Sequence, residues 1–443
     1  MNLATLSRRL AGPQWRARLS QLIPVGVGLA TISLSAYAAL GLAGHLLTPR
    51  DYAAVGSVYL LISILGPGVF VAVEQQVNRE VSGRIAVGAG HGPVPRTAAL
   101  VSTGLALLLA TALLVLAPIL LERVFAGSWG LLVATVLAVL GAAATYVLRG
   151  MFAGQRRYKW YGASMAIEGL ARALPCVVLT ALQVTEVSWW GYVFALGLGL
   201  SALLTLPGLH PGEPGPEAPV ARMSVQVGLL AGASGLTLVV ANLGPVVLTS
   251  RLGSDPAGAA MAASFVSLFV LARIPILLFT PLQAVLLATL TPAVELGAVD
   301  AVRTRVRVVL TGVLGIGALG VLGAATLGPW AAELFFGAPI RLSALVAASL
   351  GLGTVGMMLA QVVQPALVAL GRHRAATGAW AIGTLLFVAI LLAPVEPLAA
   401  AVTAQAVAPA AVTALMLRAL RRAMSEAVGG QARSSRAATR TRQ

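Results

Sequence analysis

The feature that most constrains this sequence is a series of long apolar runs, separated by segments that alternate between basic and nearly uncharged. Hydropathy separates about twelve runs, each long enough to cross roughly 30 Å of hydrocarbon as a helix of ~20 residues. They lie near residues 22–47, 52–73, 97–121, 129–148, 160–182, 188–208, 223–249, 257–290, 308–330, 342–370, 375–394 and 397–417. The runs lack the period-two alternation of membrane β-strands. We therefore predict an all-α polytopic membrane protein.

The basic residues predict the orientation of the chain. Most of the 30 lysines and arginines fall in one alternating set of gaps or in the two terminal segments. The opposite set of gaps holds only Arg50, Arg123, Arg251 and Arg341. Because positive charge is retained on the cytoplasmic side during insertion, we expect a multi-pass protein of the bacterial cytoplasmic membrane with both termini in the cytoplasm.

The composition argues against several classes of protein. Hydrophobic residues make up 58% of the 443 residues, only 10% are charged, and the mean hydropathy is +0.91, which does not describe a water-soluble globule. The net charge of +16 would suggest nucleic acid for a soluble domain, but topology and anionic lipid headgroups explain it here, so we predict no nucleic-acid partner. The single cysteine, Cys176, supports no disulfide framework. We predict no metal and no cofactor, and leave open whether a coupling ion, H⁺ or Na⁺, is used.

The chain is predicted to divide in two. Residues 209–222 are rich in proline and glycine and are expected to form a flexible cytoplasmic linker. This linker would join an N-terminal lobe of six spans, residues 1–208, to a C-terminal lobe of six spans, residues 223–420. The basic tail, 421–443, is predicted to be disordered.

Short sequence echoes relate the two halves. Residues 47–57 resemble 252–261, and residues 152–157 resemble 368–374. Because each half has an even number of spans, the halves would be parallel repeats, an arrangement that in transporters places a site between two bundles and gives alternating access.

Four segments carry a family resemblance: LRGMFAGQRRYKWYG (148–162), HLLTPRDYAAVG (45–56), residues 241–275 and ELFFGAPIR (333–341). In this order they resemble the polysaccharide and O-antigen export branch of the MATE-like (multidrug/oligosaccharidyl-lipid/polysaccharide) flippase superfamily. The resemblance implies a MATE-like fold and an alternating-access flippase. It also implies a lipid-linked saccharide as substrate, with membrane lipids and the glycosyltransferases or polymerase of the same pathway as partners. The chain departs from the family at Asn242, where members often carry an aspartate, which puts an ion-coupling carboxylate there in doubt.

Polar residues inside the runs are the candidates for substrate binding. Arg172 lies far from both ends of its run, where an arginine costs at least ~2.5–3.5 kcal/mol on insertion scales, and Glu168 lies one helical turn before it. The pair is interpreted either as a neutral pair that fixes helix packing, or as a cavity site in which Arg172 binds an anionic diphosphate and Glu168 orients it. Arg273 is interpreted either as snorkelling to headgroups or as a second positive charge for the same ligand. Asn242 completes the predicted set, although such residues are more often hydrogen-bond partners between helices.

A second group of basic residues follows the fourth run. Arg149, Arg156, Arg157 and Lys159 are predicted to lie at the cytoplasmic entrance. They anchor the chain by the positive-inside rule, and a role in gathering anionic donors is the alternative.

The residues favour one function among several. An alternating-access flippase for a lipid-linked anionic oligosaccharide or polysaccharide precursor is the leading hypothesis. The alternative is a cation-coupled MATE-type exporter of organic cations or drugs, which needs unpaired carboxylates in its cavity. Glu168 is the one carboxylate well inside a predicted run, and an arginine lies beside it. This small number of intramembrane carboxylates favours an anionic substrate. The scattered external acids do not suggest an enzyme, and a non-transporting scaffold stays open.

Overall fold

A computed structural model describes residues 13–253, 255–276 and 299–440, and in this part of the chain every regular element is a helix. Twelve helical stretches of the described residues are long and apolar enough to cross a membrane. The prediction of an all-α chain with about twelve spans is confirmed. Helices are the expected answer to these apolar runs, because hydrocarbon offers no hydrogen-bond partner to the backbone.

Two compact units make up the chain. Unit 1 comprises Met1–Leu238 and Gly253–Ala259, and unit 2 comprises Val239–Leu252 and Ala260–Gln443. The division therefore falls inside helix α10 (Val220–Leu252), whereas the sequence suggested residues 209–222 as the boundary.

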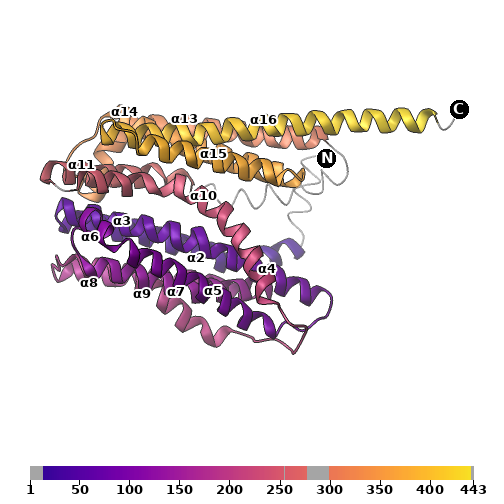
Figure 1. The fold of residues 1–443 in the computed structure, drawn as a ribbon, viewed down its shortest axis with the longest axis horizontal. Coiled ribbons are helices and arrows are strands. Elements are labelled where there is room, and N and C mark those ends of the chain that lie inside the picture. The colour runs from indigo at the N-terminus through magenta and orange to yellow at the C-terminus, as the bar shows by residue number, and fades with distance from the viewer. Residues whose placement is uncertain (1–12, 254, 277–298, 441–443) are drawn as a thin grey trace. The chain divides into compact units, whose positions relative to one another are not determined.

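Unit 1 is a bundle in which α2 packs along α8, and α7 and α8 both pack along α9 (Figure 1). Besides the first part of α10, its elements are α2 (Pro13–Leu46), α3 (Pro49–Leu65), the π-helical turn η1 (Gly66–Phe70), α4 (Val71–Ala86), α5 (Pro93–Val115), α6 (Ala117–Arg123), α7 (Trp129–Gly154), α8 (Tyr158–Ala181), α9 (Val187–Thr205) and the short η2 (Leu206–Gly208). Local sequence sets several helix starts. Thr48, for example, accepts a hydrogen bond from the Asp51 backbone N–H, with Pro49 at the first helical position.

The second span is interrupted by the π-helical turn and is longer than predicted. The run was expected at 52–73, but the helical stretch continues through α4 to Ala86. At the turn, the Ser234 hydroxyl of α10 donates to the Gly68 carbonyl oxygen at 2.6 Å. The extension brings Glu74 and Gln76 into a candidate span.

Unit 2 is built mainly on α14, which packs against both α13 and α16, while α15 also packs on α16. Besides the second part of α10, its elements are α11 (Pro256–Ala272, in part), α13 (Val299–Phe336), α14 (Ala344–Ala369), α15 (His373–Leu391) and α16 (Pro397–Arg440). Helix α16 extends to Arg440 (Figure 1).

The predicted flexible linker, 209–222, is bound to unit 1. Side chains or backbone of Arg84, Gly92, Thr97 and Gln155 donate hydrogen bonds to it at 2.5–3.2 Å. The acceptors are the main-chain carbonyl oxygens of His210, Glu213, Pro216, Glu217 and Ala218. Proline and glycine prevent regular structure here, but they leave carbonyl groups available to these donors.

Acid is expected to loosen this linker through His91. The His91 Nε2 atom lies 3.1 Å from the amide nitrogen of Gln155, and only the neutral ring accepts that N–H. Burial lowers the pKa of His91, the positive charges of Arg84 and His210 lower it further, and Glu213 opposes them. A lowered pKa means that the unfolded chain binds the proton more tightly. Stability is therefore complete above the ordinary histidine pKa of about 6.5 and is lost as the pH falls below it.

Hydrogen exchange of residues 209–219 measures this effect. After each rate is divided by the intrinsic rate of an unprotected amide at the same pH, we expect weaker protection at pH 5 than at pH 7.5 in the wild type. We expect little change of this protection with pH in His91→Gln, which keeps an acceptor but does not titrate. The same pH dependence in both proteins would assign the effect to another group.

Candidate functional site

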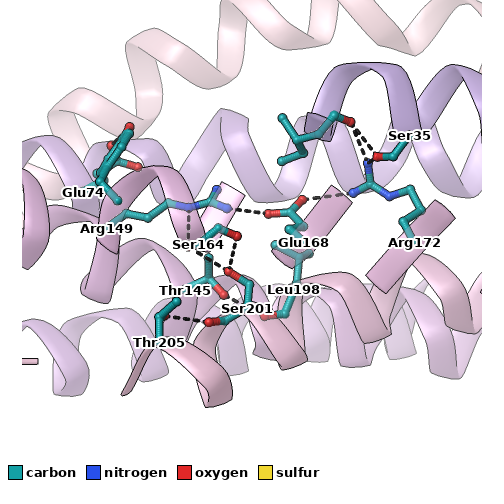
Figure 2. A network of polar contacts seen from close by, with 12 residues as sticks. Ser35, Glu74, Thr145, Arg149, Ser164, Glu168, Arg172, Leu198, Ser201 and Thr205 are labelled. Carbon is teal, nitrogen blue, oxygen red and sulfur yellow. Dashed lines mark hydrogen bonds and ion pairs between the residues drawn. The ribbon is translucent and has the colours of Figure 1, made fainter. Parts of the chain in front are cut away.

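Three buried charged side chains form the centre of unit 1. Arg149 of α7 and Arg172 of α8 reach Glu168 of α8 from opposite sides (Figure 2). The distances are 2.7 Å from Arg149 Nη2 to Glu168 Oε2 and 3.0 Å from Arg172 Nη2 to Glu168 Oε1. Exposure is only 2% for Arg149 and 5% for each of the other two. The predicted pairing of Glu168 with Arg172 is confirmed, and it is shared with a second arginine.

Arg149 is held firmly by its surroundings. Its Nε atom donates to the Ser164 hydroxyl at 2.9 Å, and its guanidinium lies 5.4 Å from the centre of the Tyr146 ring. Ser164 is itself within 2.8 Å of the Ser201 hydroxyl, which donates to the Ser164 carbonyl oxygen (Figure 2). This packing fixes the side chain, since each of these small groups is buried and hydrogen-bonded.

Arg172 is held more loosely. Its Nη1 atom makes two long contacts with α2, 3.3 Å to the Ile32 carbonyl oxygen and 3.4 Å to the Ser35 hydroxyl. Its Nε atom is buried without a hydrogen-bond partner among the described residues. The Phe194 ring of α9 lies 5.2 Å from the guanidinium carbon.

A second carboxylate lies near the same cluster. Glu74 of α4 accepts a 2.7 Å hydrogen bond from the Tyr161 hydroxyl of α8, and Figure 2 places it beside Arg149. Glu74 is not among the residues predicted from sequence, because it lies one residue beyond the second apolar run, 52–73. Residues 74–86 contain no proline and no two adjacent glycines, and this absence of helix-breaking residues was the signal that the helix continues to Ala86.

Arg273 and Asn242 lie in unit 2. Arg273 follows the end of α11 and donates through Nη2 to the Ala241 carbonyl oxygen at 2.7 Å and to Gln405 Oε1 of α16 at 2.9 Å. Its guanidinium also lies 4.6 Å from the centre of the Phe269 ring. Asn242 is the next residue after Ala241, so the structure brings this part of α10 to Arg273.

Arg149 differs in burial from the other residues of the predicted entrance group. Arg156 and Lys159 are exposed, and Arg157 is partly buried and donates to the Gly208 carbonyl oxygen, as expected for residues near a helix end. Arg149 instead lies within α7, which continues to Gly154. Its side chain points into the bundle because Glu168 and Ser164 satisfy its charge and hydrogen bonds there.

The arrangement leaves Glu168 unavailable to a cation and offers a guanidinium group. Both Glu168 oxygens accept hydrogen bonds from arginine, and one Glu74 oxygen accepts from Tyr161. Such a site has little to offer an organic cation. A phosphate group could replace the carboxylate as the partner of an arginine, since both present two oxygens to the guanidinium fork.

Comparison with solved structures defines the class of fold. The chain is similar to a multidrug-resistance MATE family transporter of the MOP superfamily in an inward-facing conformation, with a TM-score of 0.70, 12% identity, and coverage of 92% of this chain and 99% of the other. It is also similar to a Vibrio cholerae MATE transporter, with a TM-score of 0.61, 16% identity and coverage of 91% and 96%. A third match is a MOP superfamily transporter from Pyrococcus furiosus, described as having a binding pocket of reversed polarity that suggests a different function (TM-score 0.62, 14% identity, coverage 92% and 95%). The chain has the MATE transporter fold.

Curated relatives are more similar in sequence. An uncharacterized protein of Mycobacterium bovis and one of Mycobacterium tuberculosis are each 28% identical over 391 residues, covering 84% of this chain and 85% of theirs. A further uncharacterized Mycobacterium tuberculosis protein is 26% identical over 388 residues, covering 84% of each chain. No protein family model matches the sequence.

Proposed function

We propose that this protein is an alternating-access flippase that moves a lipid-linked anionic oligosaccharide or polysaccharide precursor across the bacterial cytoplasmic membrane. The MATE transporter fold supports movement of a solute by conformational change. In this proposal both termini are cytoplasmic, and the basic residues Arg156, Arg157 and Lys159 lie where the anionic substrate enters.

The observation that carries this proposal is the state of Glu168. Its two oxygens are both bound by guanidinium groups, so the more deeply buried of the two carboxylates in the cluster is not free to bind a cation. Intramembrane charges of this kind commonly mark a substrate pathway. A buried guanidinium suits a phosphorylated ligand, for which arginine is the better-shaped cation.

An exporter of organic cations is the competing function. It would use Glu74, which is only partly buried and has one oxygen bonded to Tyr161. Arg149 lies beside this carboxylate in Figure 2, and its positive charge opposes the binding of a second cation.

Proteoliposomes distinguish the two functions. We expect wild-type protein to move a fluorescent polyprenyl diphosphate between leaflets, measured by dithionite quenching of the accessible label. We also expect no accumulation of ethidium, measured by its fluorescence, under either a proton or a sodium gradient. Arg172→Gln, which keeps the hydrogen-bonding character but loses the charge, should reduce diphosphate movement at least about tenfold.

The controls are empty liposomes and thermal unfolding of each variant. Ethidium transport without diphosphate movement would replace the proposal with the exporter. Loss of folded protein in Arg172→Gln would instead support the interpretation of Arg172 as a packing residue.

A further inference from the structure

The two arginines do not share Glu168 equally. Arg149 makes the shorter bond to the carboxylate, 2.7 Å, and is also anchored at Nε by Ser164. Arg172 makes the longer bond, 3.0 Å, and its remaining hydrogen bonds, to α2, are 3.3 and 3.4 Å long. The Nε atom of Arg172 is buried and has no hydrogen-bond partner among the described residues. Arg149 is therefore held by two short hydrogen bonds, whereas Arg172 has one short bond, two long ones and an Nε donor that is not used by the described residues.

We infer that Arg149 is a positioning residue that holds Glu168 permanently, and that Arg172 is the arginine that exchanges this carboxylate for a phosphate of the ligand. This inference rests on the proposed function, because it assigns roles within the same site. It makes no use of a change in protonation.

The exchange keeps every buried charge paired. When Arg172 turns to a phosphate, Glu168 retains Arg149, so no carboxylate is left alone in a medium of low dielectric constant. Without Arg149, Glu168 would have Arg172 as its only arginine among the described residues. The carboxylate would then compete with the ligand for the same guanidinium.

The surroundings of Arg172 suit this movement. The Phe194 ring, 5.2 Å from the guanidinium carbon, supports the flat face of the guanidinium without using its donors. Its two α2 contacts are weak by distance and are readily given up. The unused Nε atom and a neighbouring Nη atom form the fork that binds two phosphate oxygens.

The ligand chemistry is a phosphate or diphosphate ester, which could be carried on a membrane lipid or be free in solution. Binding of tritiated farnesyl diphosphate to protein in phosphatidylcholine nanodiscs measures the interaction, with unlabelled inorganic pyrophosphate as competitor. Displacement by pyrophosphate identifies recognition of the phosphates alone. Failure of pyrophosphate to displace a bound farnesyl diphosphate identifies a membrane-borne diphosphate, and both results support the exchange.

Four variants test the roles. Arg172→Gln should weaken binding at least about tenfold, and Arg149→Gln should do the same although Arg172 is intact. Removing the competing carboxylate in the double variant Arg149→Gln with Glu168→Gln should restore binding to within about threefold of the wild type. Arg149→Lys, which keeps the positive charge beside Glu168, should bind almost as the wild type does.

If Arg149 had only a structural role, adding Glu168→Gln to Arg149→Gln would not restore binding. If Arg149→Gln binds as tightly as the wild type, or if the double variant stays as weak as Arg149→Gln while its unfolding temperature is normal, the exchange is overturned and the proposed function stands. If wild-type protein binds no farnesyl diphosphate, the proposed function fails as well.

Discussion

Replacement of Glu168 by alanine is expected to destabilise unit 1 by roughly 3–5 kcal/mol, because it leaves two buried guanidinium groups without their shared counter-charge. Arg172→Ala should cost less, since Glu168 keeps Arg149. The chain contains its own reporter: Cys176, the only cysteine, is 1% exposed and lies one turn after Arg172 in α8. Its reaction with a fluorogenic maleimide during heating in detergent measures the unfolding temperature of this region.

Apolar replacement of the whole cluster separates stability from function. The triple variant Arg149→Met, Glu168→Leu and Arg172→Met removes all three charges of the triad, and replacing a buried charged triad by apolar residues of similar volume is often neutral or stabilising. We therefore expect an unfolding temperature near that of the wild type, together with loss of diphosphate movement in proteoliposomes. A triple variant that is stable and still transports would show that the cluster only packs the helices.

The spans were predictable from sequence because apolar length is a local property of the chain. The same locality explains the errors. The run predicted at 129–148 was ended at its first charge, Arg149, but α7 continues to Gly154. Arg149 is separated from Arg156 and Arg157 by a segment rich in apolar residues and glycine, and this spacing was the available signal that it belongs inside.

Apolar runs and helical spacing do not predict contacts between residues that are far apart in the sequence. The Glu168 and Arg172 pair was predictable, since residues four apart on a helix are neighbours. The bond from Arg149 to Glu168 depends instead on how α7 packs beside α8. The linker illustrates the same limit, because its proline and glycine content predicts irregular backbone but not the donors, Arg84 among them, that bind its carbonyl groups.

Close approach of α2 and α8 leaves no room for an added side chain at Gly28. A Cβ atom at Gly28 would lie 2.4 Å from the Gly162 carbonyl oxygen and 2.8 Å from Met165 Cβ. The first of these atoms belongs to the α8 backbone and cannot move without moving the helix. Gly28→Leu is therefore expected to destabilise unit 1 by roughly 3 kcal/mol or more, at the upper end of the cost of overpacking.

Gly26 provides the matched control for this prediction, because it lies on the same helix with nothing within 4 Å of an added Cβ. Gly26→Leu should leave the labelling of Cys176 on heating unchanged, whereas Gly28→Leu should expose this thiol at a much lower temperature. Equal behaviour of the two variants would mean that α2 does not pack against α8 at this distance. Since α2 supplies the Ile32 and Ser35 contacts of Arg172, separation of α2 from α8 should also release this arginine. Gly28 of α2 and Gly162 of α8 thereby allow the helix spacing at which Arg172 reaches its α2 contacts.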